Sequence, residues 1–187
     1  MPKEKKKSRI LGIDPGTQVM GYAFIEARGS DFKIDSVGIV RLDQYKDHYE
    51  RLEMIASKLN TLIERYQPEE MGIEAPFFGK NVQSMLKLGR AQGVAIATAM
   101  LKKVAVTEYS PRKIKQAITG NGNSSKEQVA EMIKRICKMD SLPRYHDATD
   151  ALAVAVCHSM QNKTGAGEKK QYTGWAAFAK DNEKRVR

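Results

Sequence analysis

The sequence predicts an α/β fold in which a mixed β-sheet is flanked by helices. Two observations lead to this prediction. Three apolar runs of strand length follow one another near the start of the chain, and later strand-length runs alternate with segments whose apolar residues recur at helical spacing. Three antiparallel strands followed by parallel strands are therefore expected. At 187 residues, the chain has the length of one ordinary domain with tails.

The first three strands form the antiparallel part of the predicted sheet. The segment Arg9–Asp14 is a short apolar run, and Pro15-Gly16-Thr17 supplies the turn after it. Residues 22–26 and 32–41 continue as strands, with Arg28-Gly29-Ser30 as the turn between them. These three strands are expected to form an antiparallel meander.

Helices and shorter strands alternate from residue 49 onward. We expect helices over 49–66, 81–103 and 145–160, and strands over 71–75 and 104–108. Pro111 starts a short basic helix, because proline favours a first helical turn. The segment Ser124-Ser125-Lys126-Glu127 fits a capping box that opens another helix. Small residues within 81–103 permit close approach of a second helix, in the same chain or across a dimer.

Positive charge is concentrated in three parts of the chain, whose net charge is +10. Residues 1–9 carry five basic and one acidic side chain, and residues 163–187 carry seven basic and three acidic. The region between these two tails, residues 10–162, therefore has a net charge of +2. Inside that middle region, residues 79–126 hold nine bases against one acid. A clustered positive surface releases counterions from a phosphate backbone, so a polyanionic partner is expected. The nine bases are Lys80, Lys87, Arg90, Lys102, Lys103, Arg112, Lys113, Lys115 and Lys126.

The chain divides into a basic N-terminal tail at 1–8, one folded domain at 9–161 and a basic C-terminal extension at 162–187. No apolar run is long enough to cross a membrane, and the charged start lacks a signal-peptide pattern, so a cytosolic protein is expected. Cys137 and Cys157 have no partner at metal-ligand spacing and are expected to be buried free thiols.

Four acids stand at places that suggest a functional site, at the ends of strands and at the start of a helix. Asp14 and Glu74 each end an apolar strand, although either one could merely cap a turn. Asp147 and Asp150 are three apart, and so share one face at the start of a helix whose dipole favours negative charge. Leu152–Val156 contains no polar residue, which predicts that this helix is buried on most sides.

Carboxylates from separate elements, without a neighbouring His or Cys ligand set, suit hard cations such as Mg²⁺ or Mn²⁺. Two such ions would activate a water molecule and stabilise the leaving oxygen of a phosphodiester. Acidic clusters together with a basic surface therefore predict phosphodiester hydrolysis.

Five segments, taken in order, resemble the bacterial RuvC Holliday-junction resolvases. They are 10–17 (ILGIDPGT), 73–81 (IEAPFFGKN), 86–94 (LKLGRAQGV), 108–116 (EYSPRKIKQ) and 147–153 (DATDALA). The resemblance extends from about Ser8 to Met160. It implies an RNase H-like nuclease domain, a homodimer with two sites, and symmetric nicking of a four-way DNA junction in recombination and repair.

The resemblance also implies roles for individual residues. Asp14, Glu74, Asp147 and Asp150 correspond to the family's metal-binding catalytic carboxylates, with two Mg²⁺ per site and Mn²⁺ as a substitute. Phe77 corresponds to an aromatic residue that stacks on junction bases, and Lys115 and Lys126 to lysines that contact DNA and assist catalysis. A branch-migration motor is the implied partner. Further DNA contacts are expected at Lys80, Asn81, Lys87, Arg90, Arg112 and Lys113.

Several alternatives stay open at the level of the sequence. The loop after the first strand also resembles that of actin-like ATP-binding proteins, although these need two domains. A non-catalytic junction-binding module and an RNase H-like nuclease of RNA processing are the other two. His146 and His158 are candidates for proton transfer, or simply a capping neighbour and a helix-end residue. The aromatic residues Trp175 and Phe178 belong either to a docked amphipathic turn or to a disordered DNA-binding tail.

Overall fold

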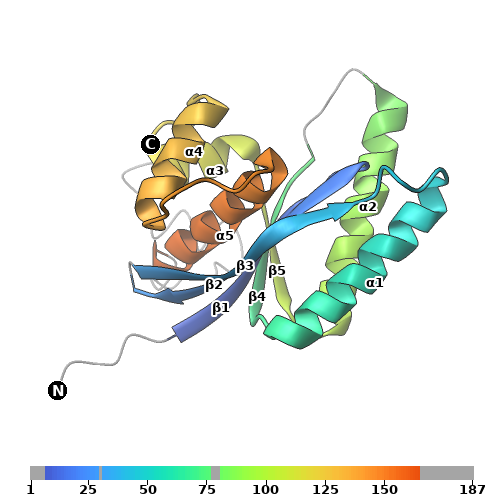
Figure 1. Cartoon of the computed structure of the whole chain (residues 1–187), viewed down its shortest axis with the longest axis horizontal. Coiled ribbons are helices and arrows are strands. Elements are labelled where there is room, and N and C mark those ends of the chain that lie inside the picture. Colours follow the sequence, from blue (N-terminus) through green and yellow to red (C-terminus); the bar gives the residue numbers. More distant parts are fainter. Residues whose placement is uncertain (1–6, 30, 77–80, 165–187) are drawn as a thin grey trace, which may run out of the picture.

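The computed structural model describes residues 7–29, 31–76 and 81–164. These residues form one five-stranded sheet in the order β3-β2-β1-β4-β5, with helices on both faces (Figure 1). The elements are β1 (Lys7–Asp14), β2 (Val19–Arg28), β3 (Asp31–Arg41), α1 (His48–Tyr66), β4 (Glu70–Glu74), α2 (Val82–Leu101), β5 (Ala105–Tyr109), α3 (Pro111–Thr119), α4 (Lys126–Ile136) and α5 (His146–Thr164). The predicted mixed sheet is confirmed.

Strand pairing agrees with the prediction of three antiparallel strands followed by parallel strands. β1 pairs antiparallel with β2, and β2 pairs antiparallel with β3. β1 also pairs parallel with β4, and β4 pairs parallel with β5. In the β1–β4 register, Ile13 lies opposite Ile73, and these residues are followed by Asp14 on β1 and Glu74 on β4. The two carboxylates therefore leave the sheet side by side.

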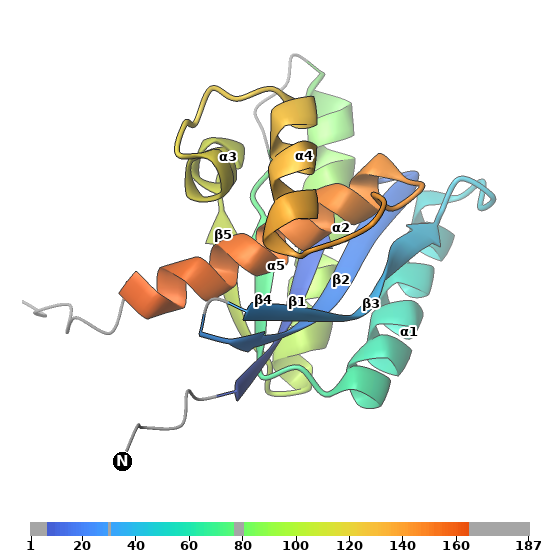
Figure 2. The same ribbon diagram turned by 60° about the vertical axis from the view of Figure 1, so that its left-hand side comes forward.

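The sheet separates two hydrophobic layers. Figures 1 and 2 show α1 and α2 on one face and α3, α4 and α5 on the other. Successive side chains of a strand point to opposite faces. Accordingly, Ile10 and Ile25 pack in the α5 layer, whereas Leu11, Ile13 and Phe24 pack in the α1–α2 layer.

Two glycines allow α5 to lie directly on the sheet. A Cβ atom at Gly12 would collide with the carbonyl oxygen of Ala151, and one at Gly21 with the carbonyl oxygen of Asp147. Because neither strand carries a side chain there, the first turns of α5 approach the backbone of β1 and β2. This close approach brings the acids of α5 to the end of β1. As predicted, Leu152–Val156 are buried.

Two helix ends differ from the prediction. The capping box of α4 is formed by Ser125 and Gln128, one residue later than expected, with the Ser125 N–H donating to Gln128 Oε1 at 2.9 Å. The reason is that the Ser124 hydroxyl is buried against Thr119 Oγ1 at 2.8 Å. Helix α5 runs to Thr164, past the expected end near Met160.

The remaining expectations about the chain concern cysteines and membranes. Cys137 and Cys157 are buried free thiols, and burial raises the pKa of each to about 11. Within the described ranges, no helix is both long enough and apolar enough to span a bilayer.

Candidate active site

Three of the four predicted carboxylates line one cavity, although they come from three different elements. Asp14 ends β1, Glu74 ends β4, and Asp150 lies in the first two turns of α5. The cavity is completed by residues from α3, α4 and α5, which are Pro111, Ile114, Lys115, Lys126, Val129 and Ala153. Parallel strands bring their carboxyl ends to one edge of a sheet, and the site is built at that edge.

Asp147 lies beside this cavity, though it is not among the residues that line it. Its charge nevertheless acts on Asp14 and raises the pKa of that carboxyl. The side chain belongs to the first turn of α5, whose backbone rests on Gly21. The four acids therefore form one electrostatic group, with three in the cavity and one at its side.

The pKa values of the two strand-end acids are strongly raised. Burial is the main cause of the rise of the Asp14 pKa to about 8, and the charges of Glu74, Asp150 and Asp147 add to it. Burial also raises the pKa of Glu74 to about 7, followed by the charge of Asp150. Like charges that share a site disfavour each other's ionised form. A cation placed among them would reverse this effect.

Two lysines supply positive charge at the edge of the cavity. Lys126 Nζ lies 3.1 Å from Asp150 Oδ2, and its charge lowers the pKa of both Asp14 and Glu74. Lys115 projects from α3 and lowers the pKa of Glu74 as well. Lys126 is the first residue of α4, where the helix dipole disfavours a cation. Its interaction with Asp150 offsets that cost.

The donor chemistry of the site suits a divalent metal ion. Carboxylate oxygens are the ligands that Mg²⁺ and Mn²⁺ prefer, and the mutually raised pKa values of Asp14 and Glu74 are relieved by positive charge. Among residues 7–29, 31–76 and 81–164, no group of three or more His, Cys, Asp or Glu side chains meets the geometry of a metal site. The carboxylates that would hold such an ion are Asp14, Glu74 and Asp150 in the cavity and Asp147 beside it.

Two of the predicted DNA-binding residues, Lys115 and Lys126, line the cavity, and the others lie on α2, at its N-cap, on α3 or outside the described residues. Lys87 and Arg90 are exposed on α2, and Arg112 and Lys113 are exposed at the start of α3. The Asn81 side chain accepts a hydrogen bond from Ser84 N at 3.0 Å, so it is the N-cap of α2. Phe77 and Lys80 fall outside the described residues.

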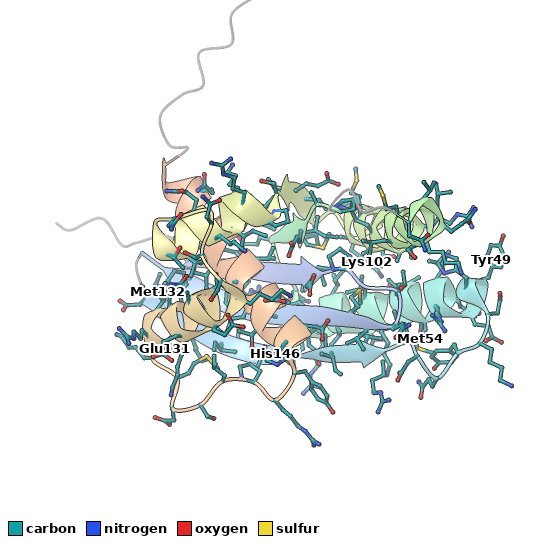
Figure 3. The ribbon with its side chains drawn as sticks, turned by 90° about the horizontal axis from the view of Figure 1, so that it is seen from above. Tyr49, Met54, Lys102, Glu131, Met132 and His146 are labelled. Atoms are coloured by element: carbon teal, nitrogen blue, oxygen red, sulfur yellow. The ribbon has the colours of Figure 1, made fainter. Side chains whose placement is uncertain are left out.

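The two histidine candidates for proton transfer have different surroundings. His158 is buried in α5, where Nδ1 lies 2.9 Å from the Tyr109 hydroxyl and Nε2 lies 2.8 Å from Glu70 Oε2. Glu70 is the first residue of β4 and Glu74 the last, so His158 lies toward the end of this strand that is opposite the cavity. It is not a helix-end residue, because α5 continues to Thr164. Figure 3 labels His146 at the start of α5, on the side of the sheet occupied by α4.

Two kinds of residue at the site carry little signal in the sequence. Gly21 has its effect through contact with α5, which becomes visible only when the two elements are packed. Gln92 is a buried polar residue among small apolar residues of α2, and it contacts the backbone of Glu74. A polar residue on an otherwise apolar helix face is the one sign that could have identified it.

A mixed sheet in this strand order, with carboxylates at the ends of β1 and β4 and on the helix packed across them, defines a nuclease of the RNase H-like class. The comparisons with known proteins are more specific. The sequence model of the family described as crossover junction endodeoxyribonuclease RuvC matches residues 10–158. The chain belongs to this RuvC family.

Relatives named crossover junction endodeoxyribonuclease RuvC match nearly the whole chain. The protein of Christiangramia forsetii is 53% identical over 184 residues, which cover 98% of this chain and 95% of the relative. The protein of Bacteroides fragilis is 50% identical over 184 residues, which cover 97% of each.

Solved structures agree with the sequence relatives. The structure of Thermus thermophilus RuvC in complex with Holliday junction substrate has a TM-score of 0.80 at 29% identity, and the match covers 84% of this chain and 96% of that one. The yeast mitochondrial Holliday junction resolvase Ydc2 has a TM-score of 0.62 at 17% identity, covering 83% of this chain and 81% of that one, and so shares the fold.

Proposed function

We propose that this protein is a metal-dependent endonuclease that resolves four-way DNA junctions by symmetric nicking. The observation that carries the proposal is the convergence of Asp14, Glu74 and Asp150 on one cavity with two lysines at its edge. Membership in the RuvC family and the likeness to a RuvC–junction complex support the choice of substrate.

The four carboxylates would hold the metal ions. Bound divalent cations, two per site and Mg²⁺ with Mn²⁺ as a substitute, supply Lewis-acid activation of a water molecule and of the scissile phosphate. Asp14 and Glu74 must be ionised to bind them; Lys126 favours the ionised form of both, and Lys115 that of Glu74. Hydrolysis by in-line attack would leave 5′-phosphate and 3′-hydroxyl ends.

The basic residues around the cavity would hold the junction. Lys126 and Lys115 stand close enough to the acids to neutralise a phosphate that enters the cavity. Lys87 and Arg90 on α2 and Arg112 on α3 are exposed bases that would contact further phosphates of the junction. Phe77 would stack on an unpaired base at the crossover, an interaction that contributes about 1–3 kcal/mol per base.

An exposed stripe on α2 supports a homodimer. The stripe is formed by Val82, Leu86, Gly89, Gly93, Ala97 and Met100, which recur every three or four residues. It lies opposite the buried face formed by Ala91, Ala95 and Ala99. A side chain added at Gly89 or Gly93 would meet no atom within 4 Å, so another helix can approach here. Exposed apolar residues in a continuous stripe favour an interface, and a second copy would bring two sites to one junction.

A branch-migration motor is the proposed partner that delivers the junction, on the basis of the family resemblance.

Cleavage of defined substrates tests the proposed function. The full chain is incubated with a synthetic four-way junction, a linear duplex of the same sequence and an RNA–DNA hybrid, each with Mg²⁺ and with EDTA. Paired nicks in opposed strands of the junction, lost in EDTA, are expected. Preferential cutting of the hybrid would instead support a nuclease of RNA processing, and binding without cutting would support an architectural protein.

A further inference from the structure

Gln92 joins helix α2 to the backbone of Glu74. Its side-chain amide nitrogen donates to the Glu74 carbonyl oxygen at 3.3 Å and to Glu108 Oε1 at 3.2 Å. The residue is 5% exposed and is the one polar member of the buried face that it shares with Ala91, Ala95 and Ala99. A buried amide costs free energy unless it is hydrogen-bonded, so these two bonds determine where it points.

Both partners of Gln92 accept hydrogen bonds, which sets the orientation of its amide. The NH₂ group has two hydrogens, one for each acceptor, whereas the amide oxygen could bond to neither. Glu108 lies on β5, the strand beside β4, so Gln92 contacts two neighbouring strands from one helix. The amide is therefore held between the end of β4 and the edge strand of the sheet.

The bonded carbonyl belongs to the point where β4 leaves the sheet. Glu74 is the last residue of β4, and the next backbone bond runs from the Ala75 N–H to the Tyr109 carbonyl at 2.8 Å. Together, these two bonds hold both polar groups of the Glu74–Ala75 peptide, its carbonyl oxygen and its N–H. The direction of the Glu74 side chain into the cavity depends on this backbone.

We propose that Gln92 is a positioning residue that fixes the backbone of Glu74 so that its carboxylate faces the metal ion. This inference rests on the proposed function, since it assigns Gln92 a role in the same site. Gln92 is not among the residues that line the cavity, and it acts through Glu74. Because it lies on the helix that carries the exposed stripe, it also connects the proposed dimer helix to the active site.

The substitution Gln92→Met tests the proposal, because methionine has a similar length and volume but no donor. We expect Mn²⁺ to bind the metal-free variant about 10-fold more weakly than wild type, in line with the effect of removing other groups that orient metal ligands. Binding of Mn²⁺ alone is followed by electron paramagnetic resonance and by calorimetry. Junction affinity in EDTA should be unchanged, whereas the cleavage rate at limiting Mn²⁺ should fall by a similar factor.

Thr98→Val is the matched control. Thr98 also lies on α2, but its hydroxyl donates to the Val94 carbonyl of the same helix, at 2.8 Å. This variant should bind Mn²⁺ and cleave like wild type. Gln92→Asn, which keeps the amide but is one methylene too short, should resemble Gln92→Met and carries the test if the latter does not fold.

Wild-type Mn²⁺ affinity in a folded Gln92→Met or Gln92→Asn variant would overturn the positioning role. That outcome is separate from failure of the proposed function, which would appear as absence of junction cleavage by the wild-type protein itself.

Discussion

Lys126 Nζ lies 3.1 Å from Asp150 Oδ2 and thereby places a positive charge inside the acidic group of the cavity. The same ammonium lowers the pKa of Asp14 and of Glu74. Within the described part of the chain, Asp14, Glu74 and Asp147 form no ion pair with lysine or arginine. The lysine is thus shared electrostatically by the acids while it contacts only one of them.

Removing this charge should shift the pH dependence of cleavage. In Lys126→Met the pKa values of Asp14 and Glu74 rise further, so a higher pH is needed to ionise them for metal binding. The acid limb of the pH–rate profile should move to higher pH, and the rate at pH 7 should fall about 100-fold because a charge that stabilises the phosphate is also lost. Lys134→Met, on the same helix, is the control and should leave the limb in place.

The raised pKa of Asp14 predicts how metal-free stability depends on pH. The folded-state pKa of about 8 lies above the ordinary value of 3.8. Between these values the folded state retains a proton that the unfolded chain has lost, so the free energy of unfolding falls as the pH rises from 4 to 8. Asp14→Asn removes this penalty and should raise the Tm at pH 8 in EDTA by about 3 °C, equivalent to about 1 kcal/mol.

Thermal melts at pH 5 and pH 8, with EDTA and with Mg²⁺, check this expectation. Mg²⁺ should stabilise wild type more at pH 8 than at pH 5, because binding requires ionised carboxylates. The quantity to compare is the difference in Tm between Asp14→Asn and wild type in EDTA, which should be larger at pH 8 than at pH 5. An equal difference at the two pH values would contradict the assignment of a raised pKa to Asp14.

Phe77→Ala should weaken junction cleavage more than affinity for linear duplex. Loss of one stacked base corresponds to about 1–3 kcal/mol, or about 5- to 150-fold in rate. Cleavage of the four-way junction is compared with duplex binding measured by fluorescence anisotropy. Equal losses in the two assays would indicate that Phe77 has a packing role instead.

Gly93→Glu should convert a dimer to a monomer without unfolding it. A side chain at this position meets no atom within 4 Å in the protomer. Glutamate also stabilises a helix by about 0.5–1 kcal/mol relative to glycine. Two opposed carboxylates in the α2 stripe would repel each other. Sedimentation velocity measures the mass, with Gln83→Glu on the same helix as a control that should stay dimeric. A dimeric Gly93→Glu would place the interface elsewhere.

Much of the fold could be predicted because local patterns and sheet geometry agree. The apolar runs before Asp14 and Glu74 indicated strands, and parallel pairing of those strands then brings the two acids together. The (i, i+3) spacing of Asp147 and Asp150 indicated a shared helix face, which is present at the start of α5. These relations depend on backbone periodicity, which the sequence encodes directly.

The parts that could not be predicted depend on packing between distant elements. The interaction of Lys126 with Asp150 joins residues of different helices, and His158 could be located only once α5 was packed against β4 and β5. The shift of the capping box to Ser125 follows from a tertiary hydrogen bond of Ser124. Gln92 is the clearest example, since its proposed role depends on a backbone carbonyl of another element.

The most direct test of the carboxylate site is the rate at which Asp14→Asn and Glu74→Gln nick a synthetic four-way junction in Mg²⁺. Each variant should lose at least about 100-fold in cleavage, because even residues that only orient metal ligands contribute 10- to 100-fold. Junction binding in EDTA should remain near the wild-type level for both. If either variant nicks the junction in Mg²⁺ at the wild-type rate, its carboxylate does not hold the catalytic metal.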